Sequence, residues 1–342
     1  MGTTSSKSTS SSSLTPNMIR TFGQIRNQAE RFTYFRALPD VLQKEMWGYL
    51  NLREKSKLAG TSKEYKGLLS NDLMTAKMLM LVAQGQQPQA RALQEHQPNL
   101  LSQRGDVTDY SGRTFKNITA YEYAYWAKDW HMCRMLEAQM DEETKALTLA
   151  SCEKMERNGL TYTQNGVEFR GSKHFDFRPL KEAYANYIQI YDRWAANNAT
   201  NAELDAAWFA IGVMQRDVPA YVAQEYCRPD RKFHPRPVFD EPNLPRTLTF
   251  YNYRTERDEQ WFPIVISGTS GLGVDFVLIR AGGGARGWLG CWQAARRGPP
   301  GRQAAAYDLT AVTSLDEAST AELTRSRENL KPLAHGLDGP GL

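Results

Sequence analysis

The sequence is poor in cysteine: Cys133, Cys152, Cys227 and Cys291 are scattered over 342 residues. No two of them form a Cys-x-x-Cys pair, and none has a histidine at the spacing of a zinc site. We therefore expect no bound metal and no cofactor. Isolated thiols of this kind are typical of a reducing compartment, where cysteine is buried as a small apolar residue.

Long apolar runs and an excess of one charge are also missing. No run approaches the roughly 18 apolar residues that a membrane helix needs, and the first residues lack the apolar segment of a Sec-type signal. Lys and Arg total 42 and Asp and Glu total 38, which gives a formal net charge of +4. Because the two signs are interspersed and the basic residues do not cluster, we expect no nucleic-acid partner.

Serine and threonine are abundant at the start of the chain. Residues 1–16, MGTTSSKSTSSSSLTP, cannot bury enough apolar surface to offset the entropy of ordering, so residues 1–30 are expected to form a disordered tail. The tail begins Met-Gly-x-x-x-Ser, with Gly2 and Ser6 in the positions that N-myristoylation requires. We expect contact with a membrane only if Gly2 is acylated.

The remainder of the chain divides into segments of different pattern. Paired helical periods with turns between them point to a helical array, and a switch to period two marks a hairpin. A Pro-rich connector then leads into β-rich runs and a last helix. The expected divisions are a docking domain at 31–72, helical repeats at 73–140, a helical extension with a β-hairpin at 141–228, a mixed α/β region at 229–331 and a flexible tail at 332–342.

Local signals predict where several elements begin and end. Asp141 and Thr200 are expected N-caps, because their side chains can accept backbone N–H groups of a first helical turn. Gly85 is an expected helix terminus. The Asn-Gly pair at 165–166 is the strongest hairpin signal in the chain. Residues 281–304, rich in Gly, Ala and Arg, are expected to be irregular.

The stretch LPDVLQKEMWGYLNLREKSKLAGTSKEYKGLL at 38–69 contains more than a core helix requires. Pro39 fixes an extended entry, because the residue before a proline disfavours the helical region. Two short helices follow, and residues 61–63 cap a third. Three short helices in about 35 residues cannot close a core of their own. The stretch therefore needs a partner, either elsewhere in this chain or in another protein.

Residues 36–69 resemble an F-box. In that family the Leu-Pro end and the apolar face that follows dock on the Skp-type adaptor of a cullin–RING ubiquitin ligase. The resemblance implies that such an adaptor is the partner, and that the docking residues are Leu38, Pro39, Leu42, Met46, Leu50 and Leu58. The alternative is an ordinary three-helix lid on the helical repeats.

Residues 109–136 resemble a degenerate ankyrin repeat. Asp109, Gly112 and Thr114 match its turn, and the sequence TAYEYA at 119–124 stands where ankyrin has Thr-Pro-Leu-His-x-Ala. Three departures weaken the match: residues that look inserted after the turn, an aspartate in place of the glycine between the helices, and a spacing longer than about 33 residues. The resemblance implies stacked helical hairpins.

The order of these parts is itself informative. An F-box followed by irregular ankyrin-like units is similar to F-box effectors that Legionella-type intracellular bacteria inject through a type IV secretion system. The likeness covers most of residues 36–330. It implies that the protein is made in the bacterial cytoplasm and exported into the host cytoplasm, and it leaves the protein target unidentified.

Two aromatic sets are candidate anchors for that target, because repeat proteins bind partners on concave surfaces where aromatic side chains dominate the binding energy. A stripe at 184–194 is expected to be core, with an exposed groove as the alternative. The set assigned to target binding lies on the repeat helices and consists of Tyr121, Tyr125, Trp126 and Trp130.

Other motifs suggest enzyme chemistry less strongly. A Gly-x-Gly-x-x-Gly at 282–287 follows a strand-like run, and Asp308 is then the candidate ribose ligand of a dinucleotide site. No second βαβ unit accompanies it, which favours a chance match in a Gly-rich loop. His174 near Asp176 is a possible acid–base pair.

We expect a mainly α fold: an F-box-like three-helix element, ankyrin-like helical hairpins, and a small antiparallel sheet in the C-terminal part. The expected function is a non-catalytic, substrate-recruiting adaptor of a host cullin–RING ligase. Two alternatives remain open: a protein-binding scaffold without a ligase link, and an enzyme with its site in residues 160–330.

Overall fold

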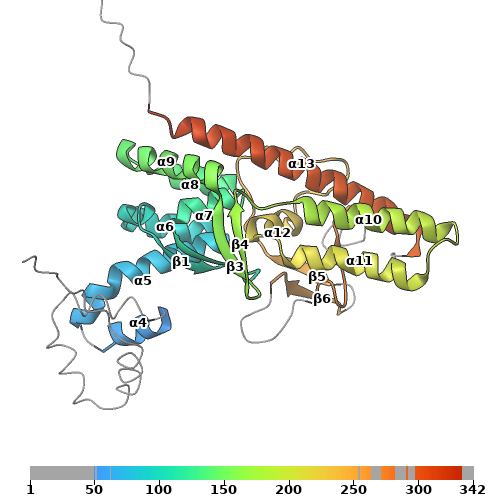
Figure 1. Ribbon diagram of the computed structural model, residues 1–342, viewed down its shortest axis with the longest axis horizontal. Helices are drawn as coiled ribbons and strands as arrows, with labels where there is room; N and C mark the ends of the chain where they lie inside the picture. The colour runs from blue at the N-terminus through green and yellow to red at the C-terminus, as the bar shows by residue number, and fades with distance from the viewer. Residues whose placement is uncertain are drawn as a thin grey trace, which may run out of the picture. The chain divides into compact units, whose positions relative to one another are not determined.

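The computed structural model describes residues 50, 52–61, 63–252, 255–262, 271–281, 290–291 and 297–332 (Figure 1). The chain divides into two compact units, Met1–Leu69 and Ser70–Leu342. The boundary lies within one continuous helix, α5 (Lys63–Ala83). The sequence patterns predict two shorter helices here, with a division at 72. The structure corrects this: Asn71 and Asp72 continue the helix, and the hydroxyl of Thr75 donates to the Asn71 carbonyl (2.8 Å).

In the N-terminal unit the structure describes α4 (Leu52–Ala59) and the start of α5. After α4, the Gly60 N–H donates to the Ser56 carbonyl (3.1 Å), and the Thr61 hydroxyl donates to the Leu58 carbonyl (2.6 Å). These bonds satisfy carbonyls that a helix end leaves without an intrahelical partner. The residues before 50, which include the first part of the expected docking domain, are outside the described part of the chain.

The larger unit is mainly helical (Figure 1). Its elements with α-helical geometry, besides the greater part of α5, are α6 (Gln87–His96), α7 (Ala120–Trp126), α8 (Trp130–Glu137), α9 (Glu142–Asn158), α10 (Arg178–Ala195), α11 (Asn201–Arg216), α12 (Ala220–Cys227) and α13 (Pro299–Asn329); a short 3₁₀ turn, η2, spans Pro98–Leu101. Among the described residues no helix is long and apolar enough to cross a bilayer.

The predicted caps are confirmed. Asp141 accepts the N–H of Thr144 (2.8 Å) at the start of α9, and Thr200 forms a reciprocal capping box with Glu203 at the start of α11. Gly85 follows α5 with φ of 67°, a left-handed conformation in which glycine is not strained. These local signals fix helix ends because each satisfies backbone groups that would otherwise lack partners.

The expected irregularity of 281–304 is wrong for its last residues. α13 begins at Pro299 and spans 31 residues, whereas the pattern SLDEASTAELTRSRENLK predicts a last helix only over 314–331. Proline is favoured in a first helical turn, where its missing N–H leaves no hydrogen bond unmade. The pair Pro299-Pro300 therefore starts this helix, although the Gly- and Arg-rich composition around it is typical of a loop.

Among the residues that the structure describes, two four-stranded sheets accompany the helices. In the first, β1 (Gly105–Thr108), β2 (Thr114–Ile118), β3 (Leu160–Gln164) and β4 (Val167–Ser172) are antiparallel and adjacent in that order. The predicted hairpin at 165–166 is confirmed, since Asn165 and Gly166 both have positive φ between β3 and β4. The expectation of a single sheet in the C-terminal part is incomplete, because this sheet lies earlier in the chain.

The second sheet lies where the sequence predicts one. It contains β5 (Thr249–Asn252), β6 (Arg257–Gln260), β7 (Leu278–Ile279) and β8 (Gly290–Cys291), in the order β6-β5-β8-β7. The β5–β8 pair is parallel and the other two pairs are antiparallel. The expected small antiparallel sheet in the C-terminal part is therefore confirmed in its two antiparallel pairs, and the parallel β5–β8 contact at Tyr251 and Gly290 joins them.

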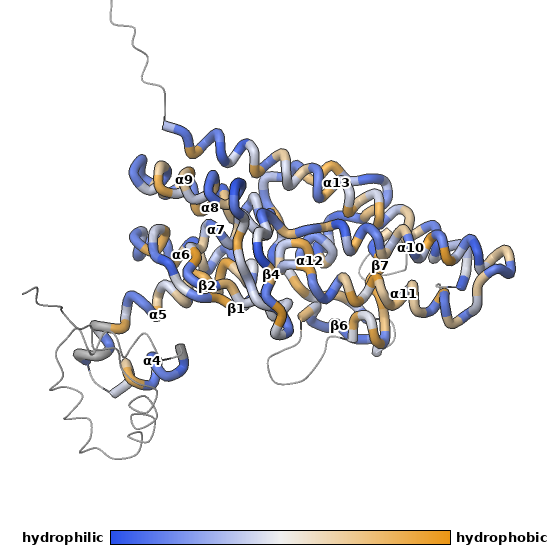
Figure 2. Tube along the Cα trace, viewed as in Figure 1, coloured by the Kyte–Doolittle hydropathy of each residue, from blue (hydrophilic) through white to orange (hydrophobic). Residues whose placement is uncertain are grey.

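One hydrophobic cluster runs through the larger unit, from Met78 to Leu330. α10 packs along α11 and α13 (Figure 1), and the stripe at 184–194 contributes Tyr184, Tyr187 and Tyr191 to this core. This confirms the core interpretation of that stripe. Figure 2 shows apolar and polar residues alternating along the helices, as expected for amphipathic helices that bury one face.

Candidate functional site

The candidate docking residues fall mostly outside the described part of the chain: this applies to Leu38, Pro39, Leu42 and Met46. Of the remaining two, Leu50 lies in a bend before α4 and Leu58 lies on α4 one residue before its end. Both are half-buried. A half-buried leucine leaves apolar surface in contact with water, which a binding partner can cover.

The candidate target-binding aromatics are not on a surface. Tyr121, Tyr125, Trp126 and Trp130 each have about 1% of their surface exposed. Every residue of α7 is buried, so this helix has no outward face. The structure therefore corrects their assignment as exposed anchors on a concave surface: they are core residues, because α7 is enclosed on all sides.

Polar partners explain how three of these four aromatic side chains are buried, whereas the indole N–H of Trp130 has no hydrogen-bond partner among the described residues. The hydroxyl of Tyr121 donates to Glu137 (2.7 Å), the hydroxyl of Tyr125 donates to Glu156 (2.6 Å), and the indole N–H of Trp126 donates to the Ser172 hydroxyl (2.8 Å). Buried tyrosine and tryptophan normally find such a partner, because leaving the group unpaired is costly. The bonds attach α7 to α8, α9 and β4.

The first polar cluster of interest surrounds Glu156 on α9. Its carboxylate accepts the Tyr125 hydroxyl and lies 3.0 Å from His174 Nε2 and 3.8 Å from Arg327. Asp176, the expected partner of His174, instead binds Arg178 (2.7 Å). The possible His174–Asp176 pair is therefore wrong, because Asp176 accepts the backbone N–H of Arg178 and pairs with its guanidinium at the start of α10.

Both ring nitrogens of His174 are engaged. Nδ1 lies 3.3 Å from the Tyr125 carbonyl, while Nε2 faces Glu156. Burial lowers the pKa of His174, and the carboxylate of Glu156 acts in the opposite direction. A general base needs a free nitrogen that faces its substrate, and His174 has none. Its role is structural, because its two ring nitrogens connect the segment before α10 to α7 and α9.

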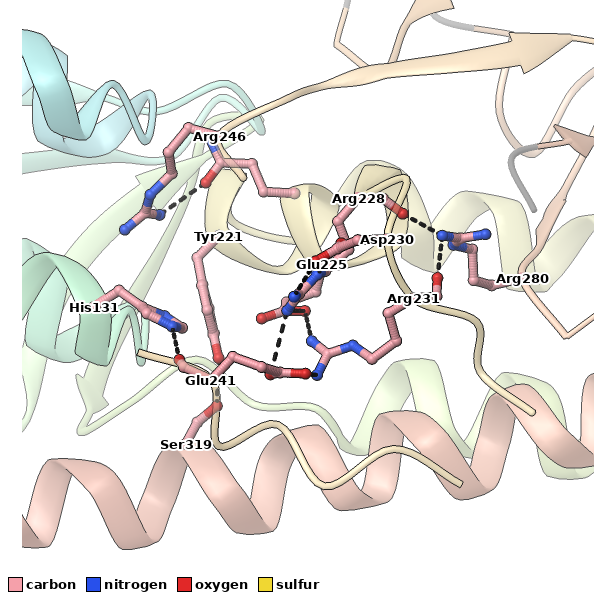
Figure 3. A network of polar contacts seen from close by, with 11 residues as sticks. His131, Tyr221, Glu225, Arg228, Asp230, Arg231, Glu241, Arg246, Arg280 and Ser319 are labelled. Atoms are coloured by element: carbon pink, nitrogen blue, oxygen red, sulfur yellow. Dashed lines mark hydrogen bonds and ion pairs between the residues drawn. The ribbon is translucent and has the colours of Figure 1, made fainter. Parts of the chain in front are cut away.

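The second and larger cluster lies around the connector that follows α12 (Figure 3). Glu225, with 1% of its side chain exposed, faces Arg228 (3.4 Å) and also pairs with Arg231. Glu241 pairs with Arg231 (2.6 Å), and Asp230 pairs with Arg228 (2.8 Å). Burial raises the pKa of Glu225, and the guanidinium groups of Arg231 and Arg228 counter that rise.

Two further contacts fasten the same connector. His131 Nε2 lies 2.9 Å from the Glu241 carbonyl oxygen, and Arg246 forms two bonds to the carboxylate of Asp129 (2.7 and 2.9 Å). Asp129 also caps α8, where it accepts the N–H of Met132. The connector is therefore held against α8 by ion pairs and hydrogen bonds (Figure 3).

Asp308 cannot serve a dinucleotide in this fold. It is fully buried on α13, where it accepts the N–H groups of Arg280 (2.8 Å) and Ala281 (2.7 Å). Burial raises its pKa to about 7, against the effect of those two N–H groups. The glycines at 282–287 lie outside the described residues. Asp308 thus stabilises the backbone after β7 and does not face a ligand.

Sequence reasoning missed the charge cluster at 225–246. Charged residues in a Pro-rich connector are usually solvated, and nothing local indicates that Glu225 is enclosed. The one available signal is that acidic and basic residues are interspersed along 225–246, with five prolines between 229 and 245. Across the residues the structure describes, no group of three or more His, Cys, Asp or Glu side chains is arranged to hold a metal ion.

Comparison with known proteins defines the family. Residues 179–330 match the family described as the CBUA0006 C-terminal domain. The chain is 39% identical over 277 residues to the uncharacterized protein CBUA0006 of Coxiella burnetii, and the alignment covers 76% of each protein. The chain therefore belongs to the same family as this Coxiella protein. No solved structure matches the chain.

Proposed function

We propose that the protein is a non-catalytic adaptor, whose N-terminal unit docks on the Skp-type adaptor of a cullin–RING ubiquitin ligase and whose larger unit binds a protein target. One observation carries the proposal. The F-box-like stretch ends at residue 69, where the N-terminal compact unit also ends. An adaptor needs a docking element that is separate from its folded body, and a compact unit that ends with the F-box-like stretch supports this proposal.

The mechanism is an increase in effective concentration. A substrate held beside the ligase reacts in an effectively intramolecular step, without any catalytic residue in the adaptor. The half-buried Leu58 on α4 supports this, because docking on a Skp-type adaptor buries apolar side chains from such short helices. The larger unit then needs only a surface that recognises its target.

The ankyrin-like character of the larger unit belongs to the same proposal. The hairpin β1–β2, α7 and α8 follow one another in the order of an ankyrin unit. Asp109 accepts the N–H groups of Ser111 (3.0 Å) and Arg113 (2.9 Å) in the hairpin turn. Thr119 and Glu122 form a capping box at the start of α7. These contacts support the interpretation that a turn at Asp109 is followed by a helix in TAYEYA at 119–124.

The proposal extends to where the protein acts. We infer that it is an effector exported by a type IV secretion system into a host cytoplasm, on the resemblance of its F-box and ankyrin-like order to such effectors. Membership of a family with a Coxiella burnetii protein is compatible with that inference. A scaffold without a ligase link is the alternative, and it differs only in what the N-terminal unit binds.

The cluster around His174 supports the enzyme alternative less well than it supports the adaptor proposal. Its carboxylate, imidazole and tyrosine hydroxyl converge as an acid–base site would require, yet each bonds another member of the cluster or the backbone. Groups that satisfy one another in this way lock elements together. The adaptor proposal accounts for them as part of the folded body.

Capture of the full chain by an immobilised, purified Skp-type adaptor tests the proposal. We expect the wild type to be retained and the double variant Leu38→Ala, Pro39→Ala to lose about tenfold or more in affinity, because central apolar anchors dominate such interfaces. Leu147→Ala is the matched control, since Leu147 is an exposed leucine (57%) outside the motif. Its capture should equal that of the wild type.

Two results would count against the proposal. If the wild type is not retained under conditions that retain a known F-box protein, the ligase adaptor function is wrong. If the double variant binds as well as the wild type, with an unchanged helical circular-dichroism signal in both, docking does not use the Leu-Pro edge.

A further inference from the structure

The β3–β4 hairpin ends the first sheet with a strand that is exposed along its length. Strand order β1-β2-β3-β4 makes β4 an edge strand, and Val167 to Gly171 are all exposed. Two of its side chains are large and apolar: Val167 is 55% exposed and Phe169 is 42% exposed. An exposed edge with apolar side chains is a template for pairing with another strand.

The apolar side of β4 continues a row of aromatic rings that begins in the core. Buried Phe115 on β2 lies opposite Tyr162 on β3, with ring centroids 5.2 Å apart. Tyr162 lies opposite Phe169 on β4, with centroids 5.0 Å apart. The row therefore runs across three strands and ends at the exposed edge, where a further aromatic ring would extend it.

The hairpin geometry determines which backbone groups of β4 face outward. Asn165 and Gly166 both have positive φ, and Gln164 pairs with Val167, so the loop has two residues. A two-residue loop closes with a hydrogen-bonded pair, and successive residues then alternate in direction. The N–H and C=O groups of Val167 and Phe169 consequently face β3, whereas those of Glu168 and Arg170 face away from the sheet.

The two residues of β4 whose backbone groups face away from the sheet also carry opposite charges. Glu168 and Arg170 lie on the same face of the strand and pair with each other (2.5 Å), while their side chains remain 46% and 78% exposed. If a second β4 runs antiparallel with Phe169 opposite Phe169, then Glu168 lies opposite Arg170, and Arg170 lies opposite Glu168. The edge is thus complementary in charge to a copy of itself.

We propose that this edge is a self-association site, at which β4 of one chain pairs antiparallel with β4 of a second copy about a two-fold axis through Phe169. A two-fold contact uses the same patch on both chains. Each Glu168–Arg170 pair exchanges two backbone hydrogen bonds and occurs twice by symmetry, which gives about four in all. The two sheets become one, and the aromatic rows meet at the Phe169 pair.

The end of the strand limits this contact. The register between β3 and β4 shifts between Leu160 and Tyr162, and Gly171 has φ of 72°, which marks a bulge next to Arg170. Bulges bend an edge strand and end its pairing. The association is therefore confined to about five residues on each copy, and it does not extend into an open-ended stack of sheets.

Sedimentation velocity on the full chain tests the proposal when the charges at positions 168 and 170 are changed. We expect the wild type to pass from monomer to dimer on the order of 10–100 µM, because short edge contacts are weak. Glu168→Arg and Arg170→Glu each place like charges opposite one another at two symmetric positions. Each should raise the dimer dissociation constant about tenfold or more.

Two further samples make the test specific for this register. The double variant Glu168→Arg, Arg170→Glu restores opposite charges across the axis and should form a dimer as the wild type does. An equimolar mixture of the two single variants should form a heterodimer, because each Arg of one chain then faces a Glu of the other. Glu153→Arg is the matched control on α9, where Glu153 pairs with Arg157 on a similarly exposed surface.

The outcomes that overturn the proposal are equally defined. A wild type that stays monomeric over the whole concentration range shows that β4 does not pair with itself. Single variants that associate as strongly as the wild type, or a charge-swapped double variant that stays monomeric, exclude this register. Thermal unfolding of each variant establishes that it is folded. The proposal is independent of ligase docking, since it involves no residue of the N-terminal unit.

Discussion

Individual buried charges in this protein are stabilised by aromatic rings as well as by counter-ions. The guanidinium of Arg113, 4% exposed, lies 5.5 to 5.8 Å from the ring centroids of Trp126, Tyr162 and Phe175, and it pairs with Asp109 (3.5 Å). Aromatic faces attract a cation through their quadrupole, more strongly where water is excluded. Trp126, one of the four aromatic residues expected to bind a target, thus stabilises an internal arginine instead.

A single buried residue, His131, makes the stability of the folded protein depend on pH. Burial lowers its pKa from 6.5 to about 4, with Asp129 acting in the opposite direction. As the pH falls from about 6.5 to 4, the unfolded chain takes up a proton that the folded chain does not. The folded state therefore loses stability across this window, by at most about 3 kcal/mol.

Replacing the imidazole isolates that effect. His131→Gln keeps a donor for the Glu241 carbonyl but cannot titrate. We expect the difference in unfolding free energy between wild type and variant to shift against the wild type as the pH falls from 7 to 4.5. Urea unfolding at several pH values measures it, and other titrating groups cancel in the difference. Parallel pH profiles for the two proteins would show that His131 does not titrate in this way.

At the scale of elements, a close backbone approach joins α11 to the turn at 271–276. A Cβ atom added at Gly212 would lie 2.4 Å from the Gly273 nitrogen and 2.7 Å from its Cα. Gly273 itself has φ of 75°, and its N–H donates to the Phe276 carbonyl (2.9 Å). Both partners in the approach are backbone, so neither can move aside as a side chain would.

Two glycine-to-alanine substitutions in helices should therefore have opposite effects. Gly212→Ala should lower the free energy of unfolding by about 1–3 kcal/mol, because the clash outweighs alanine's higher helix propensity. Gly67→Ala in α5 meets nothing within 4 Å and should raise stability by about 0.5–1 kcal/mol. Chemical denaturation measures both. Equal effects would mean that helix propensity alone decides.

Some helices and turns are predictable from the sequence, and some strand pairings are not. Asp141, Thr200 and the Asn-Gly pair at 165–166 predict their elements correctly, because a cap or a tight turn involves only neighbouring residues. The pairing of β2 with β3 is not predictable in this way, since their partners Phe115 and Tyr162 are far apart in sequence. Pairing at such separation depends on how α7, α8 and α9, which lie between the two strands in sequence, pack against one another.

For the whole molecule, the expected divisions at 140 and 228 do not separate compact units, because the larger unit begins at Ser70 and has one continuous core. α13 contacts α8 and α10, and its Asp316 accepts bonds from Lys128 (2.5 Å) and Lys181 (2.8 Å). The last helix thus packs on segments from both earlier divisions, and we expect a single unfolding transition for this unit.

Core truncations at distant points test this cooperativity. Leu136 on α8 and Leu315 on α13 are both 0% exposed. Leu136→Ala and Leu315→Ala should each lower the free energy of unfolding by about 2–5 kcal/mol. Each should shift the same transition, seen alike by tryptophan fluorescence and by far-UV circular dichroism. Two separate transitions, with each variant shifting only one of them, would show independent domains.

The sequence by itself determined the mainly helical character, the helix ends at 85, 141 and 200, the hairpin at 165–166 and the core role of the stripe at 184–194. It also carries the F-box-like stretch at 38–69, on which the proposed function depends. Only the tertiary structure decided that Tyr121, Tyr125, Trp126 and Trp130 are enclosed, that Glu225 is buried between arginines, and that β4 is an edge. The physical reason is that periodicity and caps depend on neighbours in sequence, whereas burial and strand order depend on which distant surfaces meet.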